Sequence, residues 1–333
     1  MRQPAFFLTA LLALVDTAAL AADLPSIKAA PPLPPPPLWT GFYAGLNAGY
    51  GFGANSSSTS AVWGVPGPSD YWSTNRETEA PATALGSGGA LSGYAPIKQS
   101  GFIGGGQIGY NYQYGSSFVI GLETDIQGAG LRGSGRHIGA GAEVQSASNL
   151  ATGNYIEASS NAWGGATINA GVDWLGTVRG RIGYLVSPTL LIFGTGGLTY
   201  GGVYGNVTNY AYVATTSADE DGPAGYGANH TFFGGGSRSQ TRVGWNAGGG
   251  IEWLFAPNWS VKAEAIYWNL GNATIPTAAY AVAPRPDSDP PWYGNSAFTA
   301  IGGTRVNYQG VIARMGLNYH FNWGAPAPVI AQY

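Results

Sequence analysis

The stretch that decides the fold is Val311-Ile312-Ala313-Arg314-Met315-Gly316-Leu317-Asn318-Tyr319-His320-Phe321, close to the C-terminus. Large apolar side chains alternate there with polar or small ones. Because successive side chains of a β-strand point to opposite faces, one face of this stretch is apolar and the other is polar. The apolar face would carry Val311, Ala313, Met315, Leu317, Tyr319 and Phe321, and the polar face Arg314, Asn318 and His320. We predict a strand that separates an apolar medium from a polar one.

The N-terminus has the features of an export signal. Met1 and Arg2 give a positive start, residues 5–15 are almost wholly apolar, and Ala19-Leu20-Ala21 has the small-x-small pattern of a cleavage site. The apolar run is too short for a membrane anchor, which needs about 20 residues. We therefore predict that residues 1–21 are a signal peptide that is cleaved after export.

The composition favours a membrane protein built from strands. Charged residues make up 9% of the 333 residues, against about 25% in ordinary soluble domains. The chain has 54 glycines, 20 tyrosines and 11 tryptophans, and aromatic rings are typical of the two interfaces of a membrane barrel. No later stretch has the roughly 18 apolar residues of a membrane helix. The absence of cysteine excludes thiolate chemistry, and the net charge of −3 gives no indication of nucleic-acid binding.

Eight segments repeat the two-faced pattern of the C-terminal stretch. The clearest is Phe118–Gly128, in which large apolar residues alternate with Glu123, Asp125 and Gln127. Leu190–Gly201 is apolar on both faces, so its sequence leaves open which side chains point inward. The eight predicted strands are residues 42–52, 102–114, 118–128, 173–186, 190–201, 241–255, 259–270 and 304–321.

The connections between these segments alternate strictly between short and long. Three are turn-forming triplets at residues 115–117, 187–189 and 256–258. Outer-membrane barrels have short periplasmic turns and long extracellular loops. We therefore predict an all-β fold, an eight-stranded antiparallel up-and-down transmembrane β-barrel with long extracellular loops and short periplasmic turns. The predicted loops, rich in Gly, Ser, Asn, Thr and Ala, lie near residues 53–100, 130–172, 203–240 and 271–303.

This assignment divides the chain into four parts. The signal peptide covers residues 1–21, a proline-rich periplasmic leader covers 22–38, the outer-membrane barrel covers 39–321, and a periplasmic tail covers 322–333. The prolines of the leader favour an extended polyproline conformation. The leader is either a spacer, a ligand for a proline-recognising partner, or a solvated tail.

Three short motifs resemble those of a known family. They are Ala22-Asp23-Leu24-Pro25, Trp39-Thr40-Gly41-Phe42-Tyr43-Ala44-Gly45 and Gly316-Leu317-Asn318-Tyr319-His320-Phe321. On these residues the chain resembles the OmpA-like eight-stranded outer-membrane β-barrel proteins, and most closely the porin-like surface antigens of alphaproteobacteria. The resemblance implies integral insertion in the outer membrane. It also implies that Met315, Leu317, Tyr319 and Phe321 form the assembly signal, although here twelve residues follow the closing aromatic residue.

The predicted inward faces carry nine charged side chains, which is many for a chain with few charges. Glu123 and Arg181 lie at about the same height on adjacent strands, as do Asp125 and Arg179. An eight-stranded barrel is just wide enough for side chains to fill, so paired charges would form a polar plug. A narrow pore with charged walls is the alternative. The predicted network consists of Glu123, Asp125, Arg179, Arg181, Arg242, Glu252, Lys262, Glu264 and Arg314, with Glu252 directly opposite Lys262.

The sequence gives little indication of catalysis. The three histidines, His137, His230 and His320, have no metal-ligand spacing, and no Gly-x-Ser-x-Gly motif occurs. The acidic run 219–221, with Asp219, Glu220 and Asp221, shares a predicted loop with His230. We interpret it as a solvated loop tip or a weak divalent-cation contact rather than a catalytic group. We predict no enzyme activity, no cofactor and no metal site.

The predicted loops are rich in aromatic residues, which supply contact area at low entropic cost. They serve either adhesion and ligand capture, or loop packing and the outer aromatic girdle. We predict a non-enzymatic outer-membrane barrel for envelope integrity and surface display, with a small porin as one alternative and a secreted soluble sandwich as another. The expected partners are outer-membrane lipid, lipopolysaccharide and the outer-membrane assembly machinery. A periplasmic or cell-surface partner is left open, and nucleic acid is excluded.

Overall fold

A computed structural model of the chain describes residues 38–53, 57–65, 76–148, 155–219, 227–283 and 296–321. The predicted signal peptide, the C-terminal tail and all of the leader except Leu38 lie outside these residues. No helix in the described ranges has the length and apolarity needed to cross a membrane.

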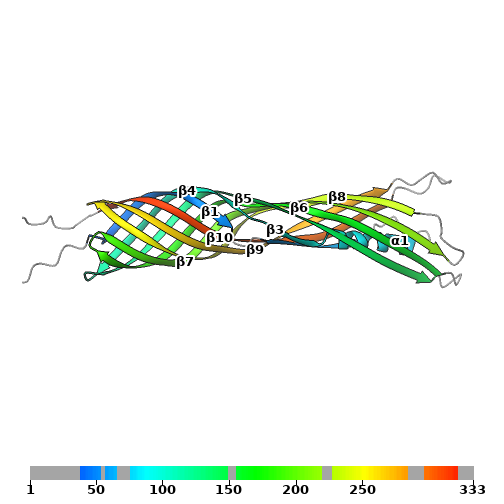
Figure 1. Ribbon diagram of the computed structural model, residues 1–333, viewed down its shortest axis with the longest axis horizontal. Helices are drawn as coiled ribbons and strands as arrows, with labels where there is room; N and C mark the ends of the chain where they lie inside the picture. The colour runs from blue at the N-terminus through cyan, green and yellow to red at the C-terminus, as the bar shows by residue number, and fades with distance from the viewer. Residues whose placement is uncertain are drawn as a thin grey trace, which may run out of the picture. The chain divides into compact units, whose positions relative to one another are not determined.

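Eight antiparallel strands pair in chain order, and the first also pairs with the last, so the ring is closed (Figure 1). This arrangement confirms the predicted eight-stranded antiparallel barrel. The turns at 115–117, 187–189 and 256–258 join three of the pairs, and the φ of +63° at Gly115 explains why glycine stands in the first turn. The strands are β1 (Gly41–Gly53), β4 (Ser100–Tyr114), β5 (Phe118–Ser148), β6 (Tyr155–Ser187), β7 (Leu190–Asp219), β8 (Gly227–Ala256), β9 (Trp259–Ala283) and β10 (Ser296–Phe321).

The strands are much longer than the predicted ones. β5 has 31 residues, β6 has 33, and β7 and β8 have 30 each, whereas about 9–11 residues span a membrane. The segments near 130–172, 203–240 and 271–303, which we predicted as loops, are therefore largely strand. Their many glycines, alanines and serines conceal the alternation of large and small side chains that marks a strand in sequence.

The first predicted loop, near 53–100, also contains regular structure. It forms β2 (Ser57–Val65), α1 (Arg76–Leu91) and β3 (Gly93–Pro96). β2 pairs with residues 299–306 of β10, beyond the point where β1 ends, and β3 pairs with β2. α1 packs against the inner faces of the long strands: Ser160 Oγ of β6 donates to the carbonyl of Ala82 at 2.7 Å, and the hydroxyls of Thr83 and Thr215 are 2.6 Å apart.

The part of the barrel next to the short turns has an apolar outer wall. Leu46, Phe102, Leu122 and Ile182 point outward with 67–80% of their surface exposed. The register of β7, which the sequence left open, places Ile192 and Leu198 outside and Leu191 and Phe193 inside. An apolar outer wall suits acyl chains. We call this part, residues 41–53, 100–128, 174–202, 243–270 and 308–321, the membrane half.

The remainder of the barrel has the opposite pattern. Its interior is apolar, with Ile168, Val207 and Ile275 among the residues buried to within 2% exposure. Closer to the strand tips, α1 contributes Ala90 and Leu91 to a second apolar cluster. Polar and charged side chains such as Arg132 lie on its outer wall. We call this part, residues 129–148, 155–172, 203–219, 227–241, 271–283 and 296–306 with β2, α1 and β3, the outer half.

Candidate functional site: a buried charge cluster

Eight of the nine charged residues predicted to face inward meet inside the membrane half. Each is exposed by no more than 6%. They come from five strands that the alternation of the β-pleat directs to the same interior. The four acids are Glu123 and Asp125 on β5, Glu252 on β8 and Glu264 on β9, and the four bases are Arg179 and Arg181 on β6, Lys262 on β9 and Arg314 on β10.

Arg179 stands at the centre of the larger part of the cluster. Its guanidinium pairs with Glu123, with Asp125 at 3.1 Å and with Glu264 at 2.9 Å. Arg314 reaches the same carboxylates from β10, at 2.7 Å from Asp125 and 2.9 Å from Glu264. Each buried charge therefore has more than one opposite partner, which offsets the loss of hydration on burial.

Lys262 joins two of these acids from a neighbouring position. Its Nζ lies 2.7 Å from Glu123 Oε2 and 2.9 Å from Glu264 Oε1. Tyr43 on β1 adds a hydroxyl that donates to Glu123 at 2.6 Å. The prediction overlooked Tyr43, although it shares the inward parity of Asn47 in the predicted first strand.

A second part of the cluster is built around Glu252. Its carboxylate pairs with Arg181 and accepts hydrogen bonds from Ser260 and, at 2.7 Å, from Asn318. His320 Nε2 lies 2.9 Å from the hydroxyl of Ser260. The guanidinium of Arg181 also lies 3.9 Å from the ring centre of Phe193, a cation–π contact.

Gly109 leaves the space that Tyr43 occupies. A Cβ at this position of β4 would lie 2.4 Å from the hydroxyl of Tyr43, closer than packed atoms approach. This glycine is required by its neighbour rather than by its own backbone conformation. The absence of a side chain at this position of β4 leaves room for Tyr43 of β1 to make its hydrogen bond to Glu123.

The structure corrects two details of the predicted network. Glu123 lies opposite Arg179, not Arg181, because adjacent strands of a barrel are staggered and the turns alone do not fix their relative height. Glu252 lies opposite Lys262 as predicted, but its carboxylate pairs with Arg181 and the lysine pairs with other acids.

Arg242 does not join the cluster. It lies on β8 where the pairing with β9 is interrupted between residues 235 and 245, and its Nε donates to the carbonyl of Leu270 at 3.3 Å. Arg238 makes a similar bond to the carbonyl of Thr274 at 3.0 Å. The two guanidinium groups thus link β8 to β9 along the stretch where the backbone pairing is interrupted. Without Arg242 the cluster has four acids and four bases.

Apolar layers enclose the charge cluster at both ends. On the turn side, the Nε1 of Trp39 donates to the carbonyl of Pro188 at 3.0 Å, and its ring packs in a cluster with Val119, Leu185, Leu191, Phe193 and Leu254. On the other side lie Ile103, Leu175, Ile266, Trp268 and Ile312 of the larger apolar core. The described interior is therefore filled in successive layers.

The described histidines lie apart from one another. His137 faces inward in the outer half, with its Nε2 3.0 Å from the carbonyl of Leu91, and His230 is buried in β8. Glu220 and Asp221 lie outside the described residues. Within the described ranges, no group of three or more His, Asp or Glu side chains is placed to hold a metal ion.

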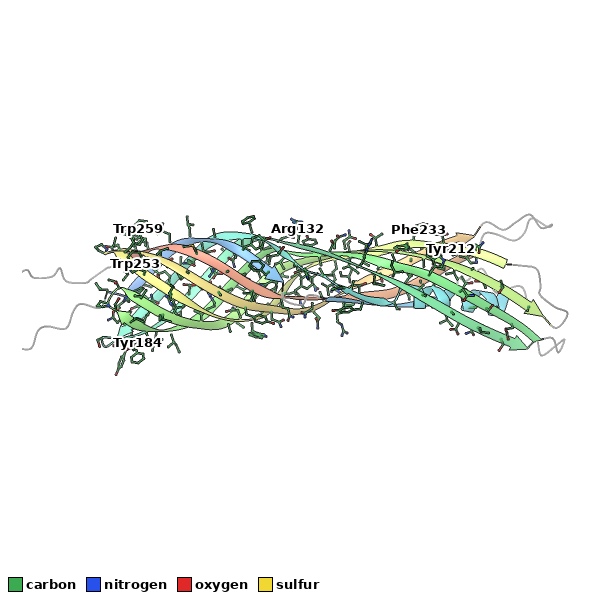
Figure 2. The ribbon with its side chains drawn as sticks, viewed as in Figure 1. Arg132, Tyr184, Tyr212, Phe233, Trp253 and Trp259 are labelled. Carbon is green, nitrogen blue, oxygen red and sulfur yellow. The ribbon has the colours of Figure 1, made fainter. Side chains whose placement is uncertain are left out.

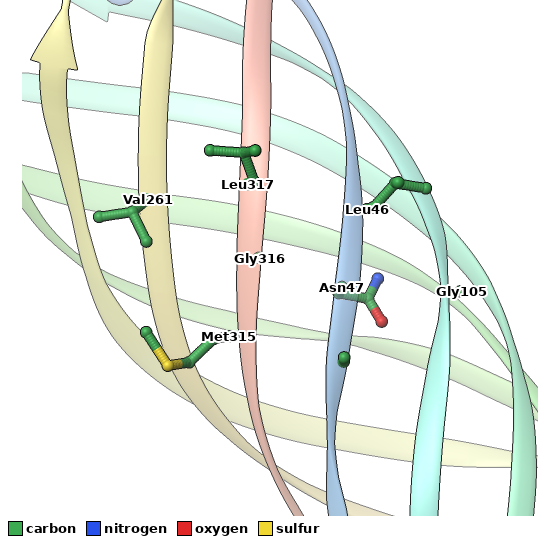
Figure 3. A pocket seen from close by; sticks show the side chains of 8 residues that line it. Leu46, Asn47, Gly105, Val261, Met315, Gly316 and Leu317 are labelled. Atoms are coloured by element: carbon green, nitrogen blue, oxygen red, sulfur yellow. The ribbon is translucent and has the colours of Figure 1, made fainter.

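The outer wall of the membrane half carries a shallow apolar hollow (Figure 3). Leu46 on β1, Val261 on β9, and Met315 and Leu317 on β10 line it. Met315, Leu317 and Tyr319, three residues of the predicted assembly signal, point outward here with 37–62% exposure. The hollow therefore faces the acyl region and not the barrel interior.

The side chains mark the two ends of the membrane half (Figure 2). Tyr184, Trp253 and Trp259 project from the wall beside the short turns, and Arg132 projects where the membrane half meets the outer half. Trp174 and Tyr200, whose ring centres are 5.9 Å apart, lie just below that level. Aromatic rings at both limits of an apolar band are typical of a barrel in a bilayer.

Comparisons with known proteins agree with this placement. No family model matches the chain. The 31 kDa outer-membrane immunogenic proteins of Brucella melitensis and Brucella suis are each 31% identical to the chain over 317 residues, which are 94% of this chain and 98% of either protein.

Two solved structures were also compared. The outer membrane protein OprG from Pseudomonas aeruginosa aligns over 85% of this chain and 96% of its own, with 12% identity and a TM-score of 0.34. Ail, the attachment invasion locus protein of Yersinia pestis, aligns over 83% and 99%, with 11% identity and a TM-score of 0.24. TM-scores of this size do not establish a common fold. The closed ring of strand pairs establishes the fold instead.

Proposed function

The chain belongs to the family of the Brucella 31 kDa outer-membrane immunogenic proteins, and we propose that it is a non-enzymatic, non-conducting barrel that supports the envelope and displays its outer half at the cell surface. Outer-membrane location and the barrel fold are the premises of this proposal. The relatives are named for immunogenicity in the outer membrane and not for an activity.

One observation carries the non-conducting role. The charge cluster is neutral by count, its members are almost fully buried, and apolar layers lie on both sides of it. A pore would need a continuous path of hydrated groups, whereas these charged groups contact one another. The interior therefore supports a structural plug that holds the strands together from within.

A conductance experiment tests the plug. Purified full-length protein in planar bilayers should give no steady single-channel currents, and neither should Arg181→Ala, although this variant should unfold at a lower temperature. Arg132→Ala, on the outer wall, is the matched control and should leave the unfolding temperature close to that of the wild type. A large, stable wild-type conductance would support the small porin instead.

Envelope support needs a test in cells. Deletion of the protein should raise sensitivity to detergents and to large antibiotics, and the wild type and Ile138→Ala, a change on the outer wall, should restore resistance. Arg179→Ala, which lowers the stability of the barrel, should restore less resistance. Normal resistance in the deletion strain would contradict the envelope role while leaving the barrel itself in place.

A second role, surface contact, has its own observation. Trp163, Phe233 and Tyr280 lie on the outward wall of the outer half with 58–64% exposure. Phe233 pairs in register with Tyr280, and the ring of Trp163 lies 5.4 Å from that of Tyr212. Such an aromatic surface supports adhesion or ligand capture. Cells that display Phe233→Ser/Tyr280→Ser should adhere to epithelial monolayers less than cells with the wild type, and equal adhesion would exclude this role.

The membrane environment supplies the remaining partners. We propose that Met315, Leu317, Tyr319 and Phe321 of the closing strand act as the signal for the assembly machinery, and that lipopolysaccharide surrounds the folded barrel. A variant with Phe321→Ser should accumulate unassembled in the periplasm, with Phe233→Ser on the outer half as the control. Normal insertion of Phe321→Ser would place the signal elsewhere.

A further inference from the structure

The described basic side chains that are exposed on the wall lie in one zone, just beyond the membrane half. Lys98, Arg132, Arg136, Arg238 and Arg305 are exposed there, and Asp173 is the one exposed acid among the described residues at this level. Among the described residues, another exposed acid, Glu157, lies nearer the strand tips. We call these five bases the basic belt.

The belt lies directly beyond the apolar band. Arg132 on β5 is about fourteen residues from Phe118 at the turn end, and Arg305 on β10 is the same distance from Tyr319. At about 3.3 Å per residue and a tilt of about 40°, this is a rise of roughly 35 Å. An apolar band of about 25 Å with its aromatic girdles ends just below that height.

The belt consists of two clusters on different sides of the wall. On one side, Arg132 pairs with Ser100 across β4 and β5, which brings it close to Lys98, and Arg136 lies on the same face of β5 four residues further along. On the other side, Arg305 pairs in register with Thr274, whose carbonyl accepts a hydrogen bond from Arg238. Two neighbouring cations form a better anion site than isolated ones do.

Contacts with Tyr204 hold the guanidinium of Arg132 in place on the outer wall. Its Nη1 donates to the hydroxyl of Tyr204 at 3.1 Å, and its guanidinium lies 5.6 Å from the centre of that ring. Asp173 lies 3.8 Å from its Nη2, yet the Arg132 side chain keeps 69% of its surface exposed. A planar guanidinium with free N–H groups is suited to bind phosphate oxygens.

We propose that the basic belt binds the phosphate groups of the phosphorylated glycolipid in the outer leaflet. Charge complementarity and height support this ligand, because the acyl chains would lie against the apolar wall while the phosphates meet the belt. The inference rests on lipopolysaccharide being the lipid that surrounds the barrel. It specifies which side chains hold that lipid, and it does not depend on whether the barrel conducts.

The test titrates the full-length barrel in detergent with bisphosphorylated lipid A, dephosphorylated lipid A and inorganic pyrophosphate, with bound ligand counted by native mass spectrometry. Lys98→Gln/Arg132→Gln/Arg136→Gln and Arg238→Gln/Arg305→Gln remove one cluster each. Each should weaken binding of the phosphorylated lipid by about fivefold for every cation removed. Dephosphorylated lipid should bind weakly to every form.

Two controls separate the site from general charge and from misfolding. Arg238→Lys/Arg305→Lys keeps the charge and should retain most of the binding. Ala142→Glu/Thr231→Glu, on the outer wall nearer the strand tips, lowers the net charge as much as Arg238→Gln/Arg305→Gln does and should bind like the wild type. Heat-modifiable gel mobility confirms that each form is folded. Unchanged binding in both cluster variants would overturn the proposal. It would also be overturned if dephosphorylated lipid A or pyrophosphate bound as tightly as bisphosphorylated lipid A. A conductance in the wild type would contradict the plug and leave this result unaffected.

Discussion

The membrane half and the outer half are built from the same strands but turn opposite faces to their surroundings. On β5 of the membrane half, Leu122 points outward and Glu123 is buried. On the same strand in the outer half, Arg132 points outward and Leu131 is buried. Odd-numbered residues of β5 face inward in both halves, although its pairing with β6 shifts register between residues 128 and 131. What changes is the medium outside the wall.

This reversal shows that strand geometry and the choice of side chains on each face have different causes. A β-strand fixes that neighbouring side chains alternate, and the solvent decides which kind of side chain belongs on each face. In the membrane half the acyl chains require an apolar exterior, so polar groups remain inside and must satisfy one another. In the outer half, water hydrates the polar side chains of the outer wall. The interior is an apolar core to which α1 contributes.

The sharpest test removes a central charge from the membrane half. Arg179→Ala leaves Glu123, Asp125 and Glu264 without their common partner, and an uncompensated buried charge costs about 3–5 kcal/mol. Urea unfolding in lipid vesicles, followed by tryptophan fluorescence, should show this loss. Arg132→Ala removes an exposed arginine and should cost no more than about 1 kcal/mol. Similar values for the two variants would mean that the cluster does not stabilise the barrel.

The equivalent test of the outer half uses two adjacent phenylalanines on β8. Phe232 is fully buried in the apolar cluster beside α1, whereas Phe233 is 64% exposed. Phe232→Ala should lower the free energy of unfolding by about 3–5 kcal/mol because it leaves a cavity, and Phe233→Ala should change it by less than about 0.5 kcal/mol. The same unfolding assay measures both. If both cost equally little, the outer half would lack a packed core.

The sequence was sufficient to predict the membrane half. Its alternation uses large residues, as in Phe118, Ile120 and Leu122 against Glu123 and Asp125, so the period of two is visible. Eight of the nine charged residues of the predicted inward set are buried together, whereas Arg242 is half-buried and bonds to the carbonyl of Leu270. The pairing of charges across the interior was not predictable, since it depends on the stagger of the barrel.

The outer half was missed for a physical reason. Its inward positions on β6 include Ala158, Ala162 and Ala166, and outward polar residues such as Asn161 and Thr167 lie next to them. Such small side chains pack closely against α1, where a Cβ on Gly86 would come within 2.5 Å of the Ser160 hydroxyl, yet they give no hydrophobic period in the sequence. A long segment of small residues was therefore interpreted as loop, although tertiary packing makes it strand.

A charge placed on the outer wall exposes the difference in medium directly. Leu122 and Ile138 both point outward from β5, with 67% and 75% exposure. Leu122→Arg should destabilise the barrel by about 2–4 kcal/mol because the charge would enter the acyl region, whereas Ile138→Arg should stay within about 0.5 kcal/mol. Folding free energies in vesicles measure both. An equal penalty at Ile138 would place the outer half in the membrane as well.

The smallest expected effect tests whether α1 is part of the outer half's core. Thr83 of α1 and Thr215 of β7 are exposed by 1% and 3%, and their hydroxyls are 2.6 Å apart. Thr83→Val alone leaves the hydroxyl of Thr215 buried without this partner and should cost about 1–3 kcal/mol, while Thr83→Val/Thr215→Val removes both polar groups and should recover much of the loss. The double-mutant cycle gives the coupling between helix and wall. If α1 were detached from the wall in the folded protein, the two substitutions would add without coupling, and hydrogen exchange of the helix amides would be as fast as in an exposed loop.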